Sequence, residues 1–233
     1  MADELDSVVS NILGQVWDSR DGKAVPSTAD VKFGGGAVRL EATMLYADLA
    51  DSTELAMNQD RRVAAKVYKC FLACASRLVK AEGGYIRSFD GDRVMGVFVG
   101  DCKNTSATKC ALKINYAFLN VITPKLLARY ETLRSGSYQL AHCVGIDVSE
   151  VLVVRGGIRN DNDLLWVGQA PNVAAKLSAI RQSPYHTLIT EAVYKRIADE
   201  AKYGPNNEEM WEARSWSTGP VATVYRSRWM WTP

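Results

Sequence analysis

The 233-residue sequence lacks a long apolar run and an excess of charge of either sign. No hydrophobic stretch approaches the roughly 18 residues that a membrane-spanning helix needs, so we expect no membrane association. The 28 basic and 26 acidic residues leave a formal charge of +2. This balance argues against the strongly basic surface of a nucleic-acid-binding protein, including a ferredoxin-like module that binds RNA.

Cysteine and histidine are also scarce. The five cysteines are odd in number and show no CxxC spacing, and only two histidines are present to complete a metal site with them. This pattern predicts reduced, packed thiols rather than a disulfide framework. The acidic start, MADELDSVV, has no basic segment of the kind that opens a secretory signal. We therefore expect a cytoplasmic protein.

The composition that remains is that of a globular protein, with 47% hydrophobic residues. Apolar residues at helical spacing predict an amphipathic helix over residues 4–18. Glycine and proline in residues 19–37 predict a linker. We expect residues 1–37 to form an N-terminal helix and linker, and residues 38–233 to form one catalytic domain.

Periodicity and turn residues predict the elements of that domain. Strands are expected at 38–50, 85–89, 93–99, 187–190 and 221–227, with a second hairpin from 138–146 and 149–155. Helices are expected at 52–82, 104–130, 170–182 and 191–201, with a polar loop at 156–163. This order predicts an α+β fold with helices packed on a mostly antiparallel sheet.

Two aspartates stand out in this pattern. In a strand, residues two apart share a face, so Tyr46 and Asp48 point the same way. Asp92 lies at the turn of the first predicted hairpin, and the two carboxylates converge if that hairpin lies beside the strand. A divalent cation relieves their repulsion, and the free amides at the start of the following helix suit a phosphate chain. The alternative is a simple helix cap and a simple turn.

Four ordered motifs decide between these readings: MLYADLADST, GGYIRSFDGDRVMGVF, CVGIDVSEVLV and WVGQAPNVAAKL. Together they resemble the catalytic domain of class III nucleotidyl cyclases over about residues 38–227. The resemblance implies a ferredoxin-like α+β sheet and a head-to-tail homodimer with active sites at the interface.

The resemblance also implies roles for individual residues. Asp48, Asp92 and the backbone carbonyl of Leu49 would bind two divalent ions, Mn²⁺ or Mg²⁺. Asn172, supplied by the other protomer, would orient the ribose, and Lys176 falls where the family carries a transition-state arginine. Lysine keeps the charge of that arginine but loses its planar fork. The triphosphate-binding residues would be Ala50, Asp51, Ser52, Thr53 and, by a looser match, Arg214.

The positions that read the base depart from the family pattern. Ser88 and Leu165 stand where adenylate cyclases carry a lysine and an aspartate or threonine, and the guanylate pair is absent too. Losing both determinants argues against a tuned purine site, because such a site discriminates through hydrogen bonds. Tyr46 replaces the usual phenylalanine, and Arg87 is close enough in sequence to reach a carbonyl. These changes favour a pyrimidine, with UTP ahead of CTP.

The whole chain resembles the stand-alone pyrimidine cyclases of bacterial Pycsar anti-phage systems. That resemblance implies synthesis of cyclic UMP, or of cyclic CMP, as a second messenger for a separate effector. An adenylate cyclase stays open as an alternative. So does a catalytically inactive, nucleotide-binding regulatory subunit, although such a subunit has no physical reason to keep two repelling carboxylates together.

Overall fold

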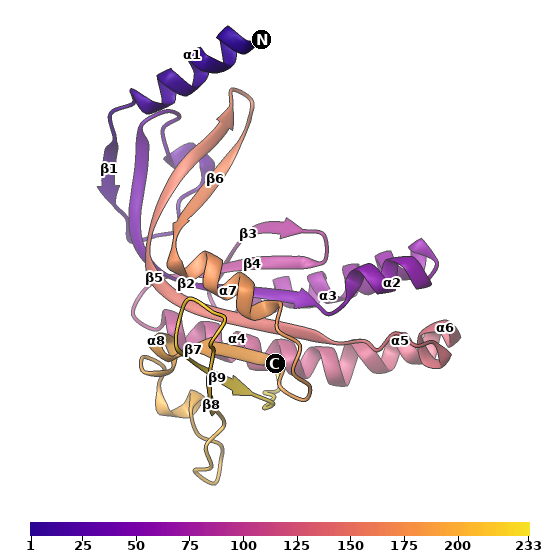
Figure 1. Ribbon diagram of the computed structural model, residues 1–233. Helices are drawn as coiled ribbons and strands as arrows, with labels where there is room; N and C mark the ends of the chain where they lie inside the picture. Colours follow the sequence, from indigo (N-terminus) through magenta and orange to yellow (C-terminus); the bar gives the residue numbers. More distant parts are fainter.

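The structure, a computed structural model, describes residues 1–233 and is built on one nine-stranded sheet (Figure 1). The strands are β1 (Asp18–Asp21), β2 (Gly36–Leu49), β3 (Tyr85–Asp90), β4 (Arg93–Phe98), β5 (His142–Ile158), β6 (Asp161–Gly168), β7 (Thr187–Thr190), β8 (Glu212–Ser215) and β9 (Thr223–Ser227). Their order is β3-β4-β2-β5-β7-β9-β8, while β1 pairs with β2 and β6 pairs with β5. Only the β1–β2 and β5–β7 pairs are parallel. The predicted α+β class is confirmed.

Helices cover both faces of this sheet. They are α1 (Ala2–Leu13), α2 (Ser52–Asn58), α3 (Arg61–Ala81), α4 (Lys103–Ala117), α5 (Thr123–Arg129), α6 (Glu131–Ser135), α7 (Gln169–Ser178) and α8 (Glu191–Tyr194), with a π turn at Phe118–Ile122 and short 3₁₀ turns at Thr28–Asp30 and Asp199–Ala201. Apolar residues at helical spacing bury α3 and α4 against one face, in a cluster of 32 buried residues. The smaller α7 packs on the other face. No helix combines the length and apolar character needed to cross a bilayer.

The close position of α7 on the sheet depends on a glycine in β5. A Cβ added at Gly145 would lie 2.2 Å from the carbonyl oxygen of Ala174 and 2.5 Å from the amide nitrogen of Ser178. Such distances are far inside van der Waals contact, so only glycine lets the helix lie this close to the sheet. The position of every residue on α7 follows from this contact.

The alternation of β2 divides its side chains between the two layers. Leu45, Ala47 and Leu49 belong to the large cluster under α3 and α4. Met44 belongs to the cluster on the α7 face, and Tyr46 packs against it. The period of two thus places Asp48, at the end of the same row, on the α7 face of the sheet.

The second predicted hairpin is wrong. β5 runs unbroken from His142 to Ile158 and makes its hairpin with β6 instead. The turn falls at Asn160, which adopts a left-handed φ of 76°, so the predicted polar loop at 156–163 is the tip of this hairpin. Ser149 does not turn the chain, because β5 stays paired with β2 through it, with Ser149 opposite Ala42. The Ser149 hydroxyl accepts a hydrogen bond from the amide of Ala170 in the first turn of α7.

Two predicted helices are interrupted. The helix expected over 52–82 is divided into α2 and α3, because Asp60 caps a new helix by accepting a hydrogen bond from the amide of Arg62 at 2.8 Å. The helix expected over 104–130 contains the π turn at 118–122, and Pro124 follows in the first turn of α5. The last predicted helix shrinks to α8 and a 3₁₀ turn, and the strand β8 was not expected.

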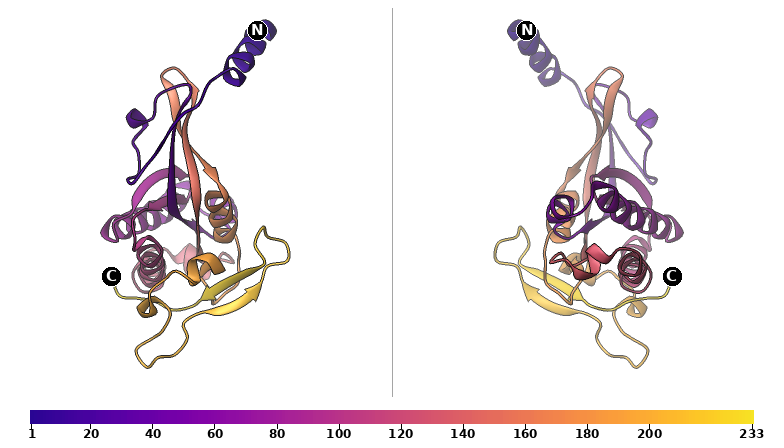
Figure 2. Two further views of the ribbon diagram at one scale, coloured as in Figure 1. Left: turned by 90° about the vertical axis from the view of Figure 1, so that its left-hand side faces the viewer. Right: turned by 90° about the vertical axis from the view of Figure 1, so that its right-hand side faces the viewer.

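The N-terminal helix forms but ends at Leu13 rather than at residue 18, and it projects from the body, close to the tip of the β5–β6 hairpin (Figures 1 and 2). The segment expected to be a linker holds a short strand and a 3₁₀ turn. β1 pairs with β2 from Asp18 opposite Gly36 to Asp21 opposite Arg39. This pairing fixes the base of α1 at the start of β2. All five cysteines are free thiols, but the expected packing holds only for Cys110 and Cys143, because Cys70 and Cys102 are exposed and Cys74 is partly exposed.

Candidate active site

The two predicted carboxylates meet at the end of β2. The β3–β4 hairpin lies beside this strand, with Ala47 opposite Val94 in the antiparallel register. One further step places Asp48 opposite Arg93 and beside Asp92, which follows the hairpin turn. The side chain of Asp48 is only 15% exposed. The expected convergence of the two aspartates therefore occurs within one chain.

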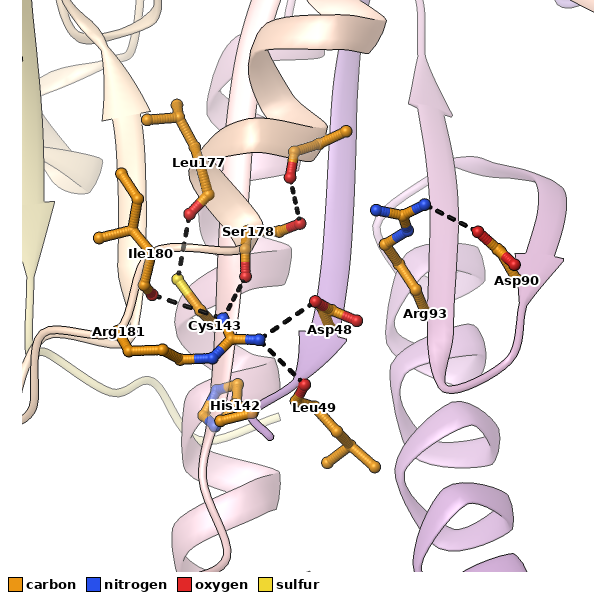
Figure 3. Close-up of polar contacts among 12 residues, drawn as sticks. Asp48, Leu49, Asp90, Arg93, His142, Cys143, Leu177, Ser178, Ile180 and Arg181 are labelled. Carbon is orange, nitrogen blue, oxygen red and sulfur yellow. Dashed lines mark hydrogen bonds and ion pairs between the residues drawn. The ribbon is translucent and has the colours of Figure 1, made fainter. Parts of the chain in front are cut away.

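An arginine that the sequence reasoning did not single out neutralises Asp48. The Nη2 atom of Arg181 lies 3.3 Å from Oδ2 of Asp48 and donates to the backbone carbonyl of Leu49 at 3.0 Å (Figure 3). The same guanidinium donates to the carbonyl of Ser178, the last residue of α7, at 2.6 Å. A single cationic group thus bridges the carboxylate and the carbonyl that the family resemblance assigns to a metal ion.

Electrostatics at this point favour a cation of higher charge. Burial and the repulsion of Asp92 raise the pKa of Asp48, while Arg181 opposes the rise. The buried Oδ2 atom of Asp92 has no hydrogen-bond partner. No cluster of three or more histidine, cysteine, aspartate or glutamate side chains exists in the chain. The available set is therefore two carboxylates and one carbonyl, an all-oxygen group that suits Mg²⁺ or Mn²⁺.

The turn between β2 and α2 contains the predicted phosphate-binding residues. Asp51 adopts a left-handed φ of 51° and precedes α2. Ser52 and Thr53 open the helix, where backbone amides have no acceptor within the helix. Ala50 departs from the expectation, because its amide already donates to the carbonyl of Ala141 at 2.8 Å. Three amides of the expected four are thus placed to meet an anion.

Asn172 and Lys176 lie on one exposed face of α7, as their spacing predicts. The amide group of Asn172 donates to the carbonyl of Gly168 at 3.1 Å, which fixes the side chain along the helix. No acidic side chain forms an ion pair with Lys176. Both groups face solvent in the single chain, the position required of residues that act on a partner.

The residues expected to read the base surround one hollow of about 440 Å³ between β3, β4, β6 and α7. Tyr46, Arg87, Ser88, Leu165 and Asn172 all line it, so the structure brings the predicted set together. The Tyr46 hydroxyl lies 3.1 Å from the sulfur of Met95. Burial raises the pKa of Tyr46, which keeps its phenol protonated and able to donate.

Two further polar residues line the same hollow and were not predicted. The guanidinium of Arg93 lies 5.4 Å from the centre of the Tyr46 ring and pairs with Asp90 at 2.8 Å. Asp163 adds an exposed carboxylate from β6, whose Oδ1 accepts from the amide of Leu164. Arg93 directly follows Asp92 in the sequence, and this adjacency was the available signal. Asp163 carried none, because the β5–β6 hairpin was not foreseen.

Arg214 lies away from these groups. It stands on β8, the far edge of the sheet, and β5, β7 and β9 separate that strand from β2. Its guanidinium pairs with Glu212 on the same strand. Within one chain Arg214 therefore cannot share a ligand with Asp48.

The fold of the chain is that of class III nucleotidyl cyclases. The crystal structure of the guanylyl cyclase Cya2 is similar over 84% of this chain and 95% of that chain, with a TM-score of 0.67 and 16% identity. The adenylyl cyclase CyaB from P. aeruginosa is similar over 82% of this chain and 95% of its own, with a TM-score of 0.64 and 18% identity. No protein-family model matches the chain.

Much nearer relatives cover the full length. The chain is 45% identical to a uridylate cyclase of Rhodovulum sp. (strain MB263), over 97% of this chain and 95% of that protein. It is 42% identical to a uridylate cyclase of Burkholderia cepacia, over 100% and 99%. The chain belongs to this family of nucleotidyl cyclases and is a nucleotidyl cyclase enzyme.

Proposed function

We propose that this chain converts UTP to 3′,5′-cyclic UMP and pyrophosphate. The observation that carries the proposal is the base hollow, where Ser88 and Leu165 leave no lysine–carboxylate pair for a purine while arginine and tyrosine donors surround the space. The full-length relatives named uridylate cyclase support the same choice.

The hollow offers hydrogen-bond donors that match the carbonyl oxygens of uracil. Uracil presents two carbonyl oxygens and one N–H group at its edge. Arg87, whose buried Nε atom has no partner within the chain, and Tyr46 can donate to the carbonyls. Asp163 can accept from the N–H group. A site that pairs all three groups rejects a base that leaves any of them unpaired.

Asp48, Asp92 and the carbonyl of Leu49 are the groups that would hold two divalent ions, Mn²⁺ or Mg²⁺. Such ions supply Lewis-acid stabilisation to the ribose 3′-oxygen and to the phosphates. The position taken by the Arg181 guanidinium supports this assignment, because a cation already fits between Asp48 and Leu49.

The remaining residues position the substrate. The amides of Asp51, Ser52 and Thr53 bind triphosphate oxygens, and Asn172 holds the ribose. The 3′-hydroxyl gives its proton to solvent water and its oxygen forms a bond to the α-phosphorus, while the bond between the α-phosphorus and the oxygen that bridges to the β-phosphate breaks and pyrophosphate leaves. Lys176 stabilises the negative charge that develops on the α-phosphate. Arg214 binds phosphate only as a residue of the second chain.

We assign the active form to a head-to-tail homodimer in which residues 38–233 form the catalytic domain and residues 1–37 an N-terminal extension. The exposed face of Asn172 and Lys176 supports the shared site, because neither residue has a partner acid in its own chain. We assign to the product the role of a second messenger in anti-phage defence, read by a separate effector in the cytoplasm.

A cytidylate cyclase is the second candidate. The sequence alone offered no acceptor for the amino group of cytosine, but the structure places Asp163 at the hollow. Its carboxylate can accept from the cytosine amino group as well as from the uracil N–H. Asp163 therefore suits both pyrimidines and does not by itself decide between them.

The purified chain should be incubated separately with UTP, CTP, ATP and GTP in Mn²⁺, and the cyclic products separated by chromatography. Cyclic UMP as the main product supports the proposal. Cyclic CMP favours the second candidate, and cyclic AMP would mean that the purine pair is dispensable. The Asp163→Asn variant should lose most of its activity with the preferred pyrimidine, while Asp161→Asn, on the same strand outside the hollow, should not.

A further inference from the structure

Helix α1 carries a row of apolar side chains that nothing in its own chain covers. Leu5, Val9 and Leu13 lie four residues apart and form one stripe along the helix. They are 57%, 55% and 81% exposed. The adjacent face, with Val8 and Ile12, borders a hollow against the chain's own β5–β6 hairpin. None of the three residues of the Leu5–Val9–Leu13 row lines that hollow, so the row is left without a partner.

The same helix is acidic. Residues 1–17 contain Asp3, Glu4 and Asp6 and no lysine or arginine. An uncovered apolar stripe flanked by acidic residues is suited to an apolar groove with a basic rim.

Such a groove exists at the other end of the molecule, between α3 and the π turn and α5. It has a volume of about 570 Å³, and its apolar lining includes Ala73, Val121 and Leu126. Its charged lining consists of Lys66, Lys69, Lys125 and Arg129, with no acidic residue. Its shape and sign match the stripe and the charge of α1.

The helix cannot reach the groove of its own chain. β1 fixes the base of α1 beside Gly36, at the start of β2. The groove lies at the opposite end of that strand, since the Tyr68 hydroxyl on α3 donates to the carbonyl of Ser52 at 2.9 Å (Figure 1). The 14 residues of β2 span about 43 Å. The four residues 14–17 extend at most about 14 Å and the helix adds about 18 Å, so α1 falls short.

We propose that the Leu5–Val9–Leu13 row of α1 docks in the α3–α5 groove of a second copy of this chain. A head-to-tail pair sets the start of one β2 near the end of the other, which places the helix and the groove in range. The inference rests on the homodimer of the proposed function and adds to it an exchange of N-terminal helices.

Native Cys70 lines the groove and is exposed, so it can report the contact. One chain carries Ala2→Cys, on the same side of α1 as the row, together with Cys70→Ser, and the second keeps Cys70. Both carry Cys102→Ser and Cys74→Ser to remove the other reactive thiols. The full-length chains are mixed and treated with a short bismaleimide. We expect a covalent dimer on a denaturing gel, and none from the matched Ser7→Cys chain, whose cysteine lies on the opposite side of α1.

A chain that holds both Ala2→Cys and Cys70 distinguishes the alternative. A single added linker mass that joins both thiols of one chain, without a dimer band, would place α1 on its own chain and overturn the proposal, as would the absence of any cross-link. UTP cyclisation is measured on the same samples. Activity without a cross-link refutes the helix exchange alone, and a cross-link without activity refutes only the proposed reaction.

A second variant tests the contact without chemistry. Val9→Glu puts a charge into the row and should weaken dimerisation at least about tenfold in sedimentation equilibrium. Ser7→Glu adds the same charge off the row and should change it little. Equal effects of the two substitutions would refute the docking, because a general charge effect does not depend on the face of the helix.

Discussion

Asp48 combines burial, a nearby like charge and a basic partner in one side chain. Asp48→Asn keeps the shape of the side chain but removes the charge, so we expect UTP turnover to fall at least about a hundredfold. Asp92→Asn should behave alike. Asp90→Asn, on the same hairpin but turned toward Arg93, is the matched control and should retain most activity. Near-normal turnover of the Asp48 variant would refute the metal assignment.

Arg181 competes with any ion for Asp48 and the carbonyl of Leu49. Removing it in Arg181→Ala should therefore tighten Mn²⁺ binding without nucleotide by about tenfold, which corresponds to about 1.4 kcal/mol. Titration of free Mn²⁺ by electron paramagnetic resonance measures this directly. Arg196→Ala, which breaks a remote pair with Glu41, should leave Mn²⁺ affinity unchanged. Weaker binding in the Arg181 variant would mean that this arginine supports the site rather than competing for it.

The sequence was sufficient to place Asp48 at the end of a strand and Asp92 at a hairpin turn, because strand periodicity and turn residues are local signals. Their convergence was predicted only on the condition that the hairpin lies beside the strand, and the β2–β4 pairing supplies that condition. The sequence was not sufficient to find Arg181. That residue follows α7 and meets Asp48 only because Gly145 lets the helix lie close on β5. Contacts between residues 133 positions apart depend on packing, which no local pattern reports.

The start of β5 carries a buried histidine between aromatic rings. His142 stacks on His186 at 5.1 Å and contacts Phe118 at 4.4 Å, and neither ring nitrogen has a hydrogen-bond partner. Burial lowers its pKa well below 6.5, so the folded state holds the neutral ring while the unfolded chain takes up a proton below that pH. The neutral His142 ring therefore costs no stability above pH 6.5. Below that pH the free energy of unfolding falls, by up to about 1.4 kcal/mol per pH unit.

The His142→Phe substitution should make the free energy of unfolding depend less on pH. Urea unfolding at about pH 7 and about pH 5.5 measures the difference for each protein. The wild-type chain should lose more stability between the two values than the variant. His186→Gln, at a less buried ring with a smaller downward shift in pKa, should reduce this pH dependence less. An unchanged pH dependence of the free energy of unfolding in the His142→Phe variant would contradict the assignment of this acid sensitivity to His142.

The β5–β6 hairpin shows why some elements escaped prediction. Ser149 and Glu150 are polar residues within an apolar run, and this pattern indicated a turn. In the structure β5 stays paired with β2 through both residues and continues to Ile158, and the Ser149 hydroxyl accepts a hydrogen bond from the first turn of α7. A local sequence pattern does not indicate a hydrogen-bond partner that lies 21 residues away. The β3–β4 hairpin, whose turn is set by adjacent residues, was predicted correctly.

The whole molecule places Asp48 and Asn172 so that each can serve a different site. We predict that Asp48→Asn and Asn172→Ala chains, each with little activity alone, recover up to about a quarter of wild-type turnover per chain when mixed. Random pairing gives about half mixed dimers, each with one intact site. Two batches of the same variant, mixed identically, are the control. If subunit exchange is verified and the mixture still recovers no activity, the result would contradict the shared site.

The placement of Asn172 and Lys176 on an outward face of α7 also has a genetic consequence. A chain that lacks both Asp48 and Asn172 spoils each of the two sites in any dimer that it joins. In a cell that carries the normal and the doubly defective allele, the defective product would therefore act as a dominant inhibitor. Its effect would grow with its dosage, so loss of cyclase activity would be inherited as a dominant trait rather than a recessive one.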